Sequence, residues 1–164
     1  LGDVDYRVVP FDEIMPSVKS GEYDVGVIIH EGQLTWKDEG VNLVLDLGIW
    51  WNEKTGLPLP LGGNVVRKDL GLEMCGKITK DVRNSIEHSL SNPEEALKFA
   101  KEWGRGIDDE TNEEFVGMYV NKRTLDYGDD GREAIRLFLR KGQEIGMVRS
   151  DLDVDSIVFV GSGE

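Results

Sequence analysis

The sequence is poor in cysteine, in long apolar runs and in positive charge, and each shortage excludes a class of protein. Cys75 is the only cysteine among 164 residues, which excludes an internal disulfide and a cysteine-based zinc site and indicates a reducing compartment. No apolar run approaches the ~20 residues of a membrane-spanning helix. With 32 acidic and 19 basic residues the net charge is −13, so the chain lacks the basic surface that binds nucleic acids or anionic membranes.

Histidine is nearly as scarce, since His30 and His88 are the only two in the sequence. Two histidines so far apart offer too few ligands for a histidine–carboxylate metal site. Residues 161–163 lack the glycine spacing and the following Lys-Ser/Thr of a phosphate loop, and residues 129–131 lack the ligand series of an EF-hand. The sequence therefore predicts no metal site.

What is present is the composition of a soluble globular chain, with 39% apolar and 31% charged residues. The length suits one domain or a piece of something larger. The chain opens at Leu1 without Met or a signal-peptide pattern and enters a strand-like run within a few residues. We therefore expect a fragment, a processed chain or the later part of a longer protein.

The first sixty residues have the pattern of a β-α-β unit. Residues 6–9 and 25–29 are strand-like runs, and residues 11–21 between them have a helical spacing that Pro16 should kink. Residues 25–29 do not alternate, which is typical of a parallel strand buried on both faces, and residues 42–47 are a third strand candidate. This pattern predicts an α/β fold with a mostly parallel sheet.

The rest of the chain, from about Leu72, has the pattern of a helical protein. Apolar residues recur at helical spacing in four stretches, which are residues 78–90, 92–103, 108–122 and 130–146. Before them, residues 57–66 contain two prolines and predict an extended segment. That segment would either cross between two lobes as a cleft wall or form a loop at a sheet edge.

His30 and Glu31 directly follow the apolar run 25–29 and raise the main functional question. Ligands of open α/β sheets bind beyond the carboxyl ends of the strands, and imidazole exchanges a proton near neutral pH. His30 is thus the best acid–base candidate, against the alternative of a strand-end histidine bonded to backbone. Glu31 either orients His30 or faces solvent, because adjacent strand residues point to opposite faces. Trp50 and Trp51 either line a pocket or fill the core.

Four stretches give the sequence a family resemblance: "IIHEGQLTW", "LDLGIWWNEKTGLPLPLGG", "VVRKDLG" and "YVNKRTLDYGDDGREAIRLF". In this order and at this spacing they resemble 1,4-dihydroxy-6-naphthoate synthase of the futalosine route to menaquinone. The resemblance runs from Val4 to about Val148, and the double tryptophan followed by TGLPLPLG is its most specific part. Chorismate dehydratase, the sister family of the same pathway, shares the fold and a motif similar to YVN..TLDYG but not that stretch.

The resemblance implies a fold and an activity. Members are similar to type II periplasmic binding proteins, in which two α/β lobes close on a ligand, so residues 1–60 would be part of the second lobe and residues 61–164 the C-terminal part of the first. They are cytoplasmic enzymes that convert cyclic dehypoxanthine futalosine to 1,4-dihydroxy-6-naphthoate without metal or organic cofactor. The histidine of their IIHE motif, here His30, is the proposed general base. The residues expected to contact the substrate, a small carboxylate, are Glu31, Trp50, Trp51, Leu57, Pro58, Leu59 and Pro60.

Two departures from the family pattern bear on activity. Gly32 stands where relatives often have Ser, and the family's N-terminal portion, which holds the substrate carboxylate, has no counterpart here. We therefore expect the chain alone to be inactive and its sheet to be covered by the missing portion or by another protein copy. A solute-binding module with the same fold and a chorismate dehydratase-like enzyme are the alternatives. Arg67 would either reach the substrate carboxylate or lie on the surface.

Overall fold

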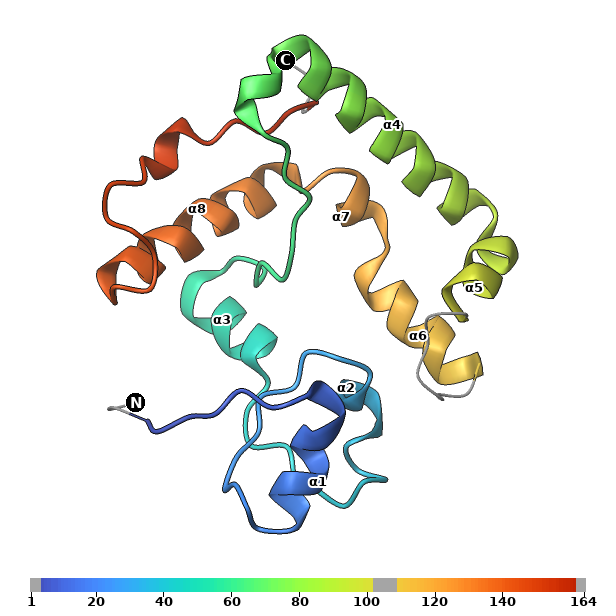
Figure 1. Ribbon diagram of the computed structural model, residues 1–164, viewed down its shortest axis with the longest axis vertical. Coiled ribbons are helices and arrows are strands. Elements are labelled where there is room, and N and C mark those ends of the chain that lie inside the picture. The colour runs from blue at the N-terminus through green and yellow to red at the C-terminus, as the bar shows by residue number, and fades with distance from the viewer. Residues whose placement is uncertain (1–3, 102–108, 162–164) are drawn as a thin grey trace.

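The computed structural model describes residues 4–101 and 109–161, and Figure 1 traces their path. The 3₁₀ turn η1 (Phe11–Glu13) leads into α1 (Ile14–Lys19), which lies with α2 (Gly32–Thr35) at one end of the molecule. Between that end and the other helices lies α3 (Leu47–Thr55). The remaining elements are η2 (Lys68–Leu70), α4 (Leu72–Ser91), α5 (Pro93–Lys101), α6 (Asp109–Tyr119), α7 (Lys122–Leu125), α8 (Gly128–Glu144) and η3 (Val154–Ser156).

The prediction of an α/β fold is wrong for the part of the chain that the structure describes, where every regular element is an α- or 3₁₀-helix. Residues 6–9, 25–29 and 42–47, which we expected as strands, lie in irregular connections instead, except that Leu47 begins α3. A strand exists through hydrogen bonds to a neighbouring backbone, and these three runs do not pair with one another. The described residues therefore do not form the two-lobed sheet fold of type II periplasmic binding proteins.

The apolar side chains of these runs consequently face solvent. Val27 is 64% exposed and Ile29 72%, and Val44 is 79% exposed. Fully burying such a side chain stabilises a protein by ~1.5–3 kcal/mol, and most of that gain is absent here. The apolar pattern indicates burial that the described residues do not supply.

The helical predictions for the second half of the chain are confirmed, because α4, α5, α6 and α8 overlap the four stretches of helical periodicity. Two of these helices begin earlier than predicted, α4 by six residues and α8 by two. Pro93 is the first residue of α5. The backbone N–H of a first helical residue has no partner within the helix, so proline, which lacks this N–H, loses no hydrogen bond there. Asp129 and Asp130 lie in the first turn of α8, where the helix dipole favours negative charge. Residues 57–67 contain no helix, as their prolines predict.

The short helix α3 is delimited by its own sequence and anchored by one tryptophan. The Asp46 carboxylate accepts a hydrogen bond from the N–H of Ile49 at 2.9 Å, and Gly56 ends the helix with a φ of 72°. Trp51 is one of the few buried apolar side chains, and its ring meets that of Phe138 edge-on at 5.5 Å between centroids. This contact docks α3 on α8 and fixes where the segment after α3 begins. The division of the chain into lobes at residue 60 stays a prediction.

Candidate functional site

The imidazole of His30 folds back on its own chain just before α2. Its Nδ1 accepts a hydrogen bond from the backbone N–H of Gly32 at 3.0 Å, and its ring centroid lies 5.1 Å from that of Phe11. The side chain is only 12% exposed, and the carboxylate of Glu31 approaches Nδ1 to 3.9 Å. His30 is therefore held against backbone and an aromatic ring of the N-terminal third.

The second ring nitrogen of His30, Nε2, is buried and has no hydrogen-bond partner among the described residues. A buried polar group in this condition costs about 1–3 kcal/mol. Such groups are rare in native proteins, and a catalytic role or a partner from elsewhere is the usual explanation. Nε2 is thus the chemically unsatisfied atom of this region.

Tyr119, the last residue of α6, connects the His30 region to the other helices. The side-chain amide of Gln33 donates to the Tyr119 hydroxyl oxygen at 2.7 Å, and that hydroxyl donates to the carbonyl of Ile29 at 3.1 Å. The two bonded residues, Ile29 and Gln33, lie before and after His30 in the sequence. The end of α6 therefore holds the segment that carries the imidazole.

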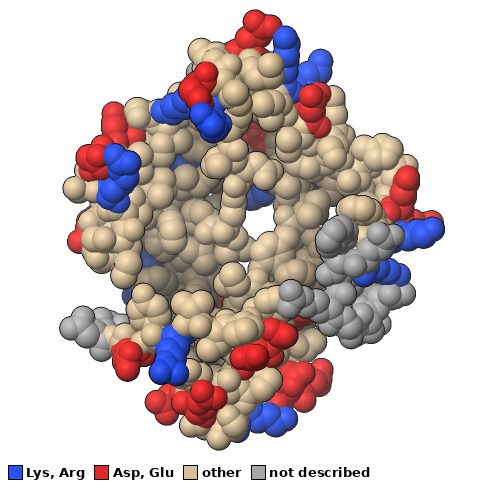
Figure 2. All heavy atoms as spheres, viewed as in Figure 1, with Lys and Arg blue, Asp and Glu red and all other residues tan. Residues whose placement is uncertain are grey.

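The same tyrosine lines a cavity of about 550 Å³. One wall is the proline-containing segment 58–64, and the facing wall comes from the end of α6, from α7 and from the start of α8. Figure 2 shows the molecule hollowed between these two walls. The facing wall is made by Met118, Tyr119, Asn121, Arg123, Thr124, Tyr127, Gly131, Ala134 and Ile135.

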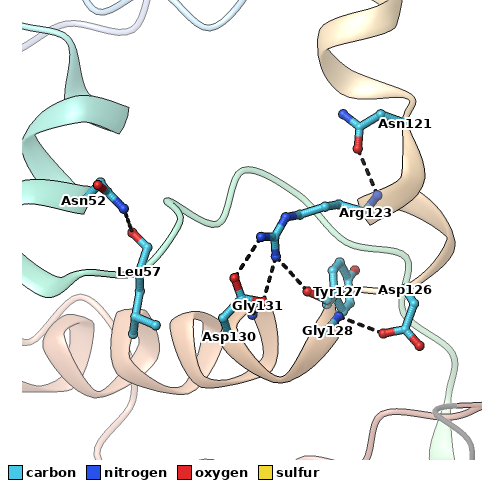
Figure 3. A network of polar contacts seen from close by, with 9 residues as sticks. All are labelled: Asn52, Leu57, Asn121, Arg123, Asp126, Tyr127, Gly128, Asp130 and Gly131. Carbon is cyan, nitrogen blue, oxygen red and sulfur yellow. Dashed lines mark hydrogen bonds and ion pairs between the residues drawn. The ribbon is translucent and has the colours of Figure 1, made fainter.

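A polar network stiffens the helical wall of this cavity (Figure 3). The guanidinium of Arg123 donates to both carboxylate oxygens of Asp130 at 2.8 and 2.7 Å and to the carbonyl of Tyr127 at 3.0 Å. The hydrogen bond and the opposite charge of Asp130 raise the pKa of Arg123, and the bond from Arg123 holds the pKa of Asp130 below its ordinary value. The Arg123 charge is thus balanced inside the network.

The same wall is fixed at the start of α7 by a capping box. The side chain of Asn121 accepts from the N–H of Arg123 at 2.9 Å, and the hydroxyl of Thr124 accepts from the N–H of Asn121 at 3.0 Å. On the opposite wall, a Cβ added at Gly63 would lie only 2.7 Å from the Tyr127 hydroxyl. Glycine at position 63 therefore lets that wall approach Tyr127.

The structure places the expected substrate-contacting residues in different surroundings. Pro58, Leu59 and Pro60 line the cavity, whereas Leu57 precedes it and accepts a bond from the Asn52 side chain (Figure 3). Trp51 is buried against Phe138, its indole N–H has no partner within the described residues, and Trp50 is 42% exposed. Glu31 lies beside His30. Arg67 is exposed and paired with Asp69.

Sequence reasoning missed the residues that join these places. Tyr119, Asn121, Arg123 and Tyr127 all lie in the stretch "YVNKRTLDYGDDGREAIRLF", which we treated as a family motif without assigning contacts to its members. The motif itself was the available signal. Gln33 gave no signal, because its bond to Tyr119 joins residues 86 positions apart.

The described residues contain neither a membrane-spanning helix nor a cluster of metal ligands. Within residues 4–101 and 109–161, no helix is long and apolar enough to cross a bilayer. In the same residues, no group of three or more His, Cys, Asp and Glu side chains is arranged to hold a metal ion.

The comparison with known proteins first gives a family. A family model described as menaquinone biosynthesis matches residues 2–144, so the chain belongs to this family. It is similar to two proteins named 1,4-dihydroxy-6-naphtoate synthase. The one from Thermus thermophilus is 43% identical over 131 residues, which are 79% of this chain and 48% of the relative. The one from Streptomyces coelicolor is 36% identical over 152 residues, 93% of this chain and 54% of the relative.

A solved structure shows the same similarity. The crystal structure of a protein from Archaeoglobus fulgidus matches with a TM-score of 0.80 at 38% identity, over 85% of this chain and 53% of that one. The chain therefore spans about half the length of the relatives that it matches.

Proposed function

We propose that the protein is a 1,4-dihydroxy-6-naphthoate synthase, a lyase-type enzyme that forms this naphthoate from cyclic dehypoxanthine futalosine. Membership of the menaquinone biosynthesis family supports this assignment, as do the two relatives of that name at 43% and 36% identity. The double-tryptophan stretch favours this activity over that of chorismate dehydratase.

The observation that carries the proposal is the buried Nε2 of His30, which has no partner among the described residues. The backbone just before His30 is bonded at Ile29 to Tyr119, a residue of the cavity wall. A group that exchanges a proton with substrate needs a rigid position and a nitrogen that no protein atom already occupies. His30 has both. Its role as the reaction's general base is part of the proposal.

The cavity supports a flat, partly polar substrate. Its volume of about 550 Å³ lies within the ~300–1,000 Å³ typical of small-molecule sites. The Pro-Leu-Pro wall offers an apolar face to a ring, and the hydroxyl of Tyr127 with the amide of Asn121 offers neutral hydrogen-bond donors to a carboxylate. The chain has a net charge of −13, and the positive charge of Arg123 at this cavity is already balanced by Asp130. An acidic substrate would therefore be bound here by neutral hydrogen-bond donors.

The proposal includes what covers the exposed apolar runs and where in the cell the protein acts. The exposed apolar runs 25–29 and 42–46 would be covered by the remaining half of the protein or by a second copy, since the relatives are about twice as long as this chain. A cytoplasmic location is supported by the cysteine content, since Cys75 is the single cysteine of the sequence.

The test is turnover with three kinds of candidate ligand. A full-length version of the protein is incubated with cyclic dehypoxanthine futalosine, with chorismate and with a panel of solutes, and the products are identified by mass spectrometry. We expect the naphthoate from the first compound only. Dehydration of chorismate would favour the sister enzyme, and tight binding without any product would favour a solute-binding module.

A further inference from the structure

We propose that Tyr127 is the specificity-determining residue of the cavity, and that its hydroxyl donates a hydrogen bond to the carboxylate of the substrate. This assignment rests on the function proposed above, which supplies an acidic substrate. It names the one atom of the helical wall that distinguishes an acidic ligand from an analogue without the acid.

The other hydroxyl and amide side chains of the helical wall are engaged by protein groups. The Tyr119 hydroxyl already donates one hydrogen bond and accepts another. The Thr124 hydroxyl donates to the carbonyl of Tyr119 at 2.9 Å and accepts from the N–H of Asn121. The Asn121 side chain accepts from the N–H of Arg123 and donates to the carbonyl of Met118 at 2.9 Å. The two hydroxyls therefore have no proton left for a ligand, and Asn121 keeps one N–H.

The hydroxyl of Tyr127 is the free donor of this wall. Within residues 4–101 and 109–161 no group bonds to it, and Arg123 bonds only to the carbonyl of the same residue. The positive charge of Arg123 is balanced by Asp130. On the opposite wall Asn64 is exposed, so water competes for its amide. A ligand in the cavity therefore meets the Tyr127 hydroxyl as its best-placed donor.

The position of this hydroxyl is fixed from three sides. The bond from Arg123 holds the backbone of Tyr127 at the start of α8. The ring meets that of Phe159 edge-on, with 6.1 Å between centroids. The hydroxyl itself lies against the opposite wall, where a Cβ at Gly63 would come within 2.7 Å of it. A donor that is already in place loses little conformational freedom when a ligand binds.

A carboxylate is the ligand group that suits such a donor. Its oxygens accept about four hydrogen bonds in all, so the Tyr127 hydroxyl can share the acid with donors from the portion of the protein that this chain lacks. A hydrogen bond to a charged acceptor is also stronger than one to a neutral acceptor. The hydroxyl should therefore contribute to the binding of acids and contribute nothing to an analogue in which the acid is missing.

The experiment compares two ligands in two proteins. The ligands are 1,4-dihydroxy-6-naphthoate and 1,4-dihydroxynaphthalene, which differ only in the carboxylate, and their Kd values are measured by calorimetry without oxygen on a full-length version of the protein. Tyr127→Phe keeps the ring and removes the hydroxyl. We expect it to weaken binding of the naphthoate by about 10–100-fold and to leave binding of the other compound unchanged. An equal loss for both ligands, or no loss for the naphthoate, overturns the proposal.

Two further variants separate the lost bond from a disturbed structure. Tyr6→Phe alters a tyrosine that is 76% exposed and lies outside the cavity lining, and it should change neither Kd. Gly63→Ala should weaken naphthoate binding in the wild type, where its methyl group displaces the Tyr127 hydroxyl, but should cost nothing more in Tyr127→Phe, where that hydroxyl is absent. Losses that add would contradict the role of the hydroxyl.

Turnover of cyclic dehypoxanthine futalosine tells the two proposals apart. Tyr127→Phe should raise KM by about the same factor as the Kd of the naphthoate, with kcat little changed. An active wild type in which Tyr127→Phe has no ligand-dependent effect refutes the assignment of Tyr127 alone. A wild type that binds the naphthoate through Tyr127 but turns nothing over refutes the proposed function alone, and one that binds neither ligand and has no turnover refutes both.

Discussion

His30 and Arg123 are two polar side chains with opposite surroundings. The His30 side chain is 12% exposed and keeps one nitrogen without a partner among the described residues. The Arg123 side chain is 55% exposed, and its guanidinium is engaged by Asp130 and by the carbonyl of Tyr127. Burial without a partner is costly and is retained where chemistry uses it, whereas an exposed, paired charge holds a structure in place. In the proposed function the reaction takes place in the first region, and the second supports the structure.

The largest expected effect is the loss of the His30 imidazole. His30→Asn should lower kcat for cyclic dehypoxanthine futalosine by ~10²–10⁴-fold, the usual contribution of an acid–base residue. The unfolding midpoint should change little, because one unsatisfied buried group is removed together with one hydrogen bond. Steady-state kinetics and thermal unfolding measure the two quantities.

The control for this variant is His88→Asn, which alters the exposed histidine of α4. It should leave kcat within the error of the wild type. Near-normal turnover of His30→Asn would place the reaction elsewhere in the protein.

The next effect concerns the connection between the two regions. Tyr119→Phe removes the hydroxyl that bonds to Ile29 and Gln33 but keeps the ring packed on Phe115 at 4.8 Å. Two lost hydrogen bonds predict a stability loss of ~1–3 kcal/mol, measured by chemical denaturation, and a reduced kcat because the His30 segment is less well held. Unchanged kcat despite the stability loss would show that Tyr119 supports the fold without positioning His30.

A smaller effect is expected at the cavity wall. Gly63→Ala places a methyl group 2.7 Å from the Tyr127 hydroxyl, so the wall must move and KM should rise several-fold at nearly constant kcat. The adjacent variant Gly62→Ala is a close control, because its Cβ would have nothing within 4 Å. Equal kinetics for the two variants would mean that this cavity does not bind the substrate.

The smallest effect belongs to the Arg123 network and depends on pH. The pKa of Asp130 is lowered in the folded protein, chiefly by the hydrogen bond from Arg123. Its contribution to stability is therefore present above the ordinary carboxyl pKa and is lost as the pH falls through the lowered value. The difference in Tm between the wild type and Asp130→Asn should be small near neutral pH and disappear in acid. In an Arg123→Gln background this pH dependence should be absent, and its persistence there would contradict the pairing.

The helices were predictable from the sequence because their stability is local. The four apolar periodicities from residue 78 onward needed only helical geometry. Pro93 and Asp129 lie in the first turns of α5 and α8, where such residues are favoured. Strands could not be predicted in the same way, because a strand also needs a neighbouring strand to bond with. Residues 25–29 have the composition of a buried strand and yet are exposed.

The site was predictable only in part, for a related reason. Position in the chain and chemical type were enough to select the prolines at 58 and 60, which line the cavity, whereas the catalytic role of His30 stays a prediction. The contacts that relate them pass through Tyr119, and its partners Ile29 and Gln33 are 90 and 86 residues away. Long-range hydrogen bonds leave no periodic trace in a single sequence.

The most direct test of the central claim is a crystal structure of the protein with 1,4-dihydroxy-6-naphthoate bound. We expect an oxygen of the ligand to lie against the Pro-Leu-Pro wall and within hydrogen-bond distance of Nε2 of His30, at about 2.7–3.2 Å. A ligand bound in another place, with Nε2 still buried and without a partner, would contradict it.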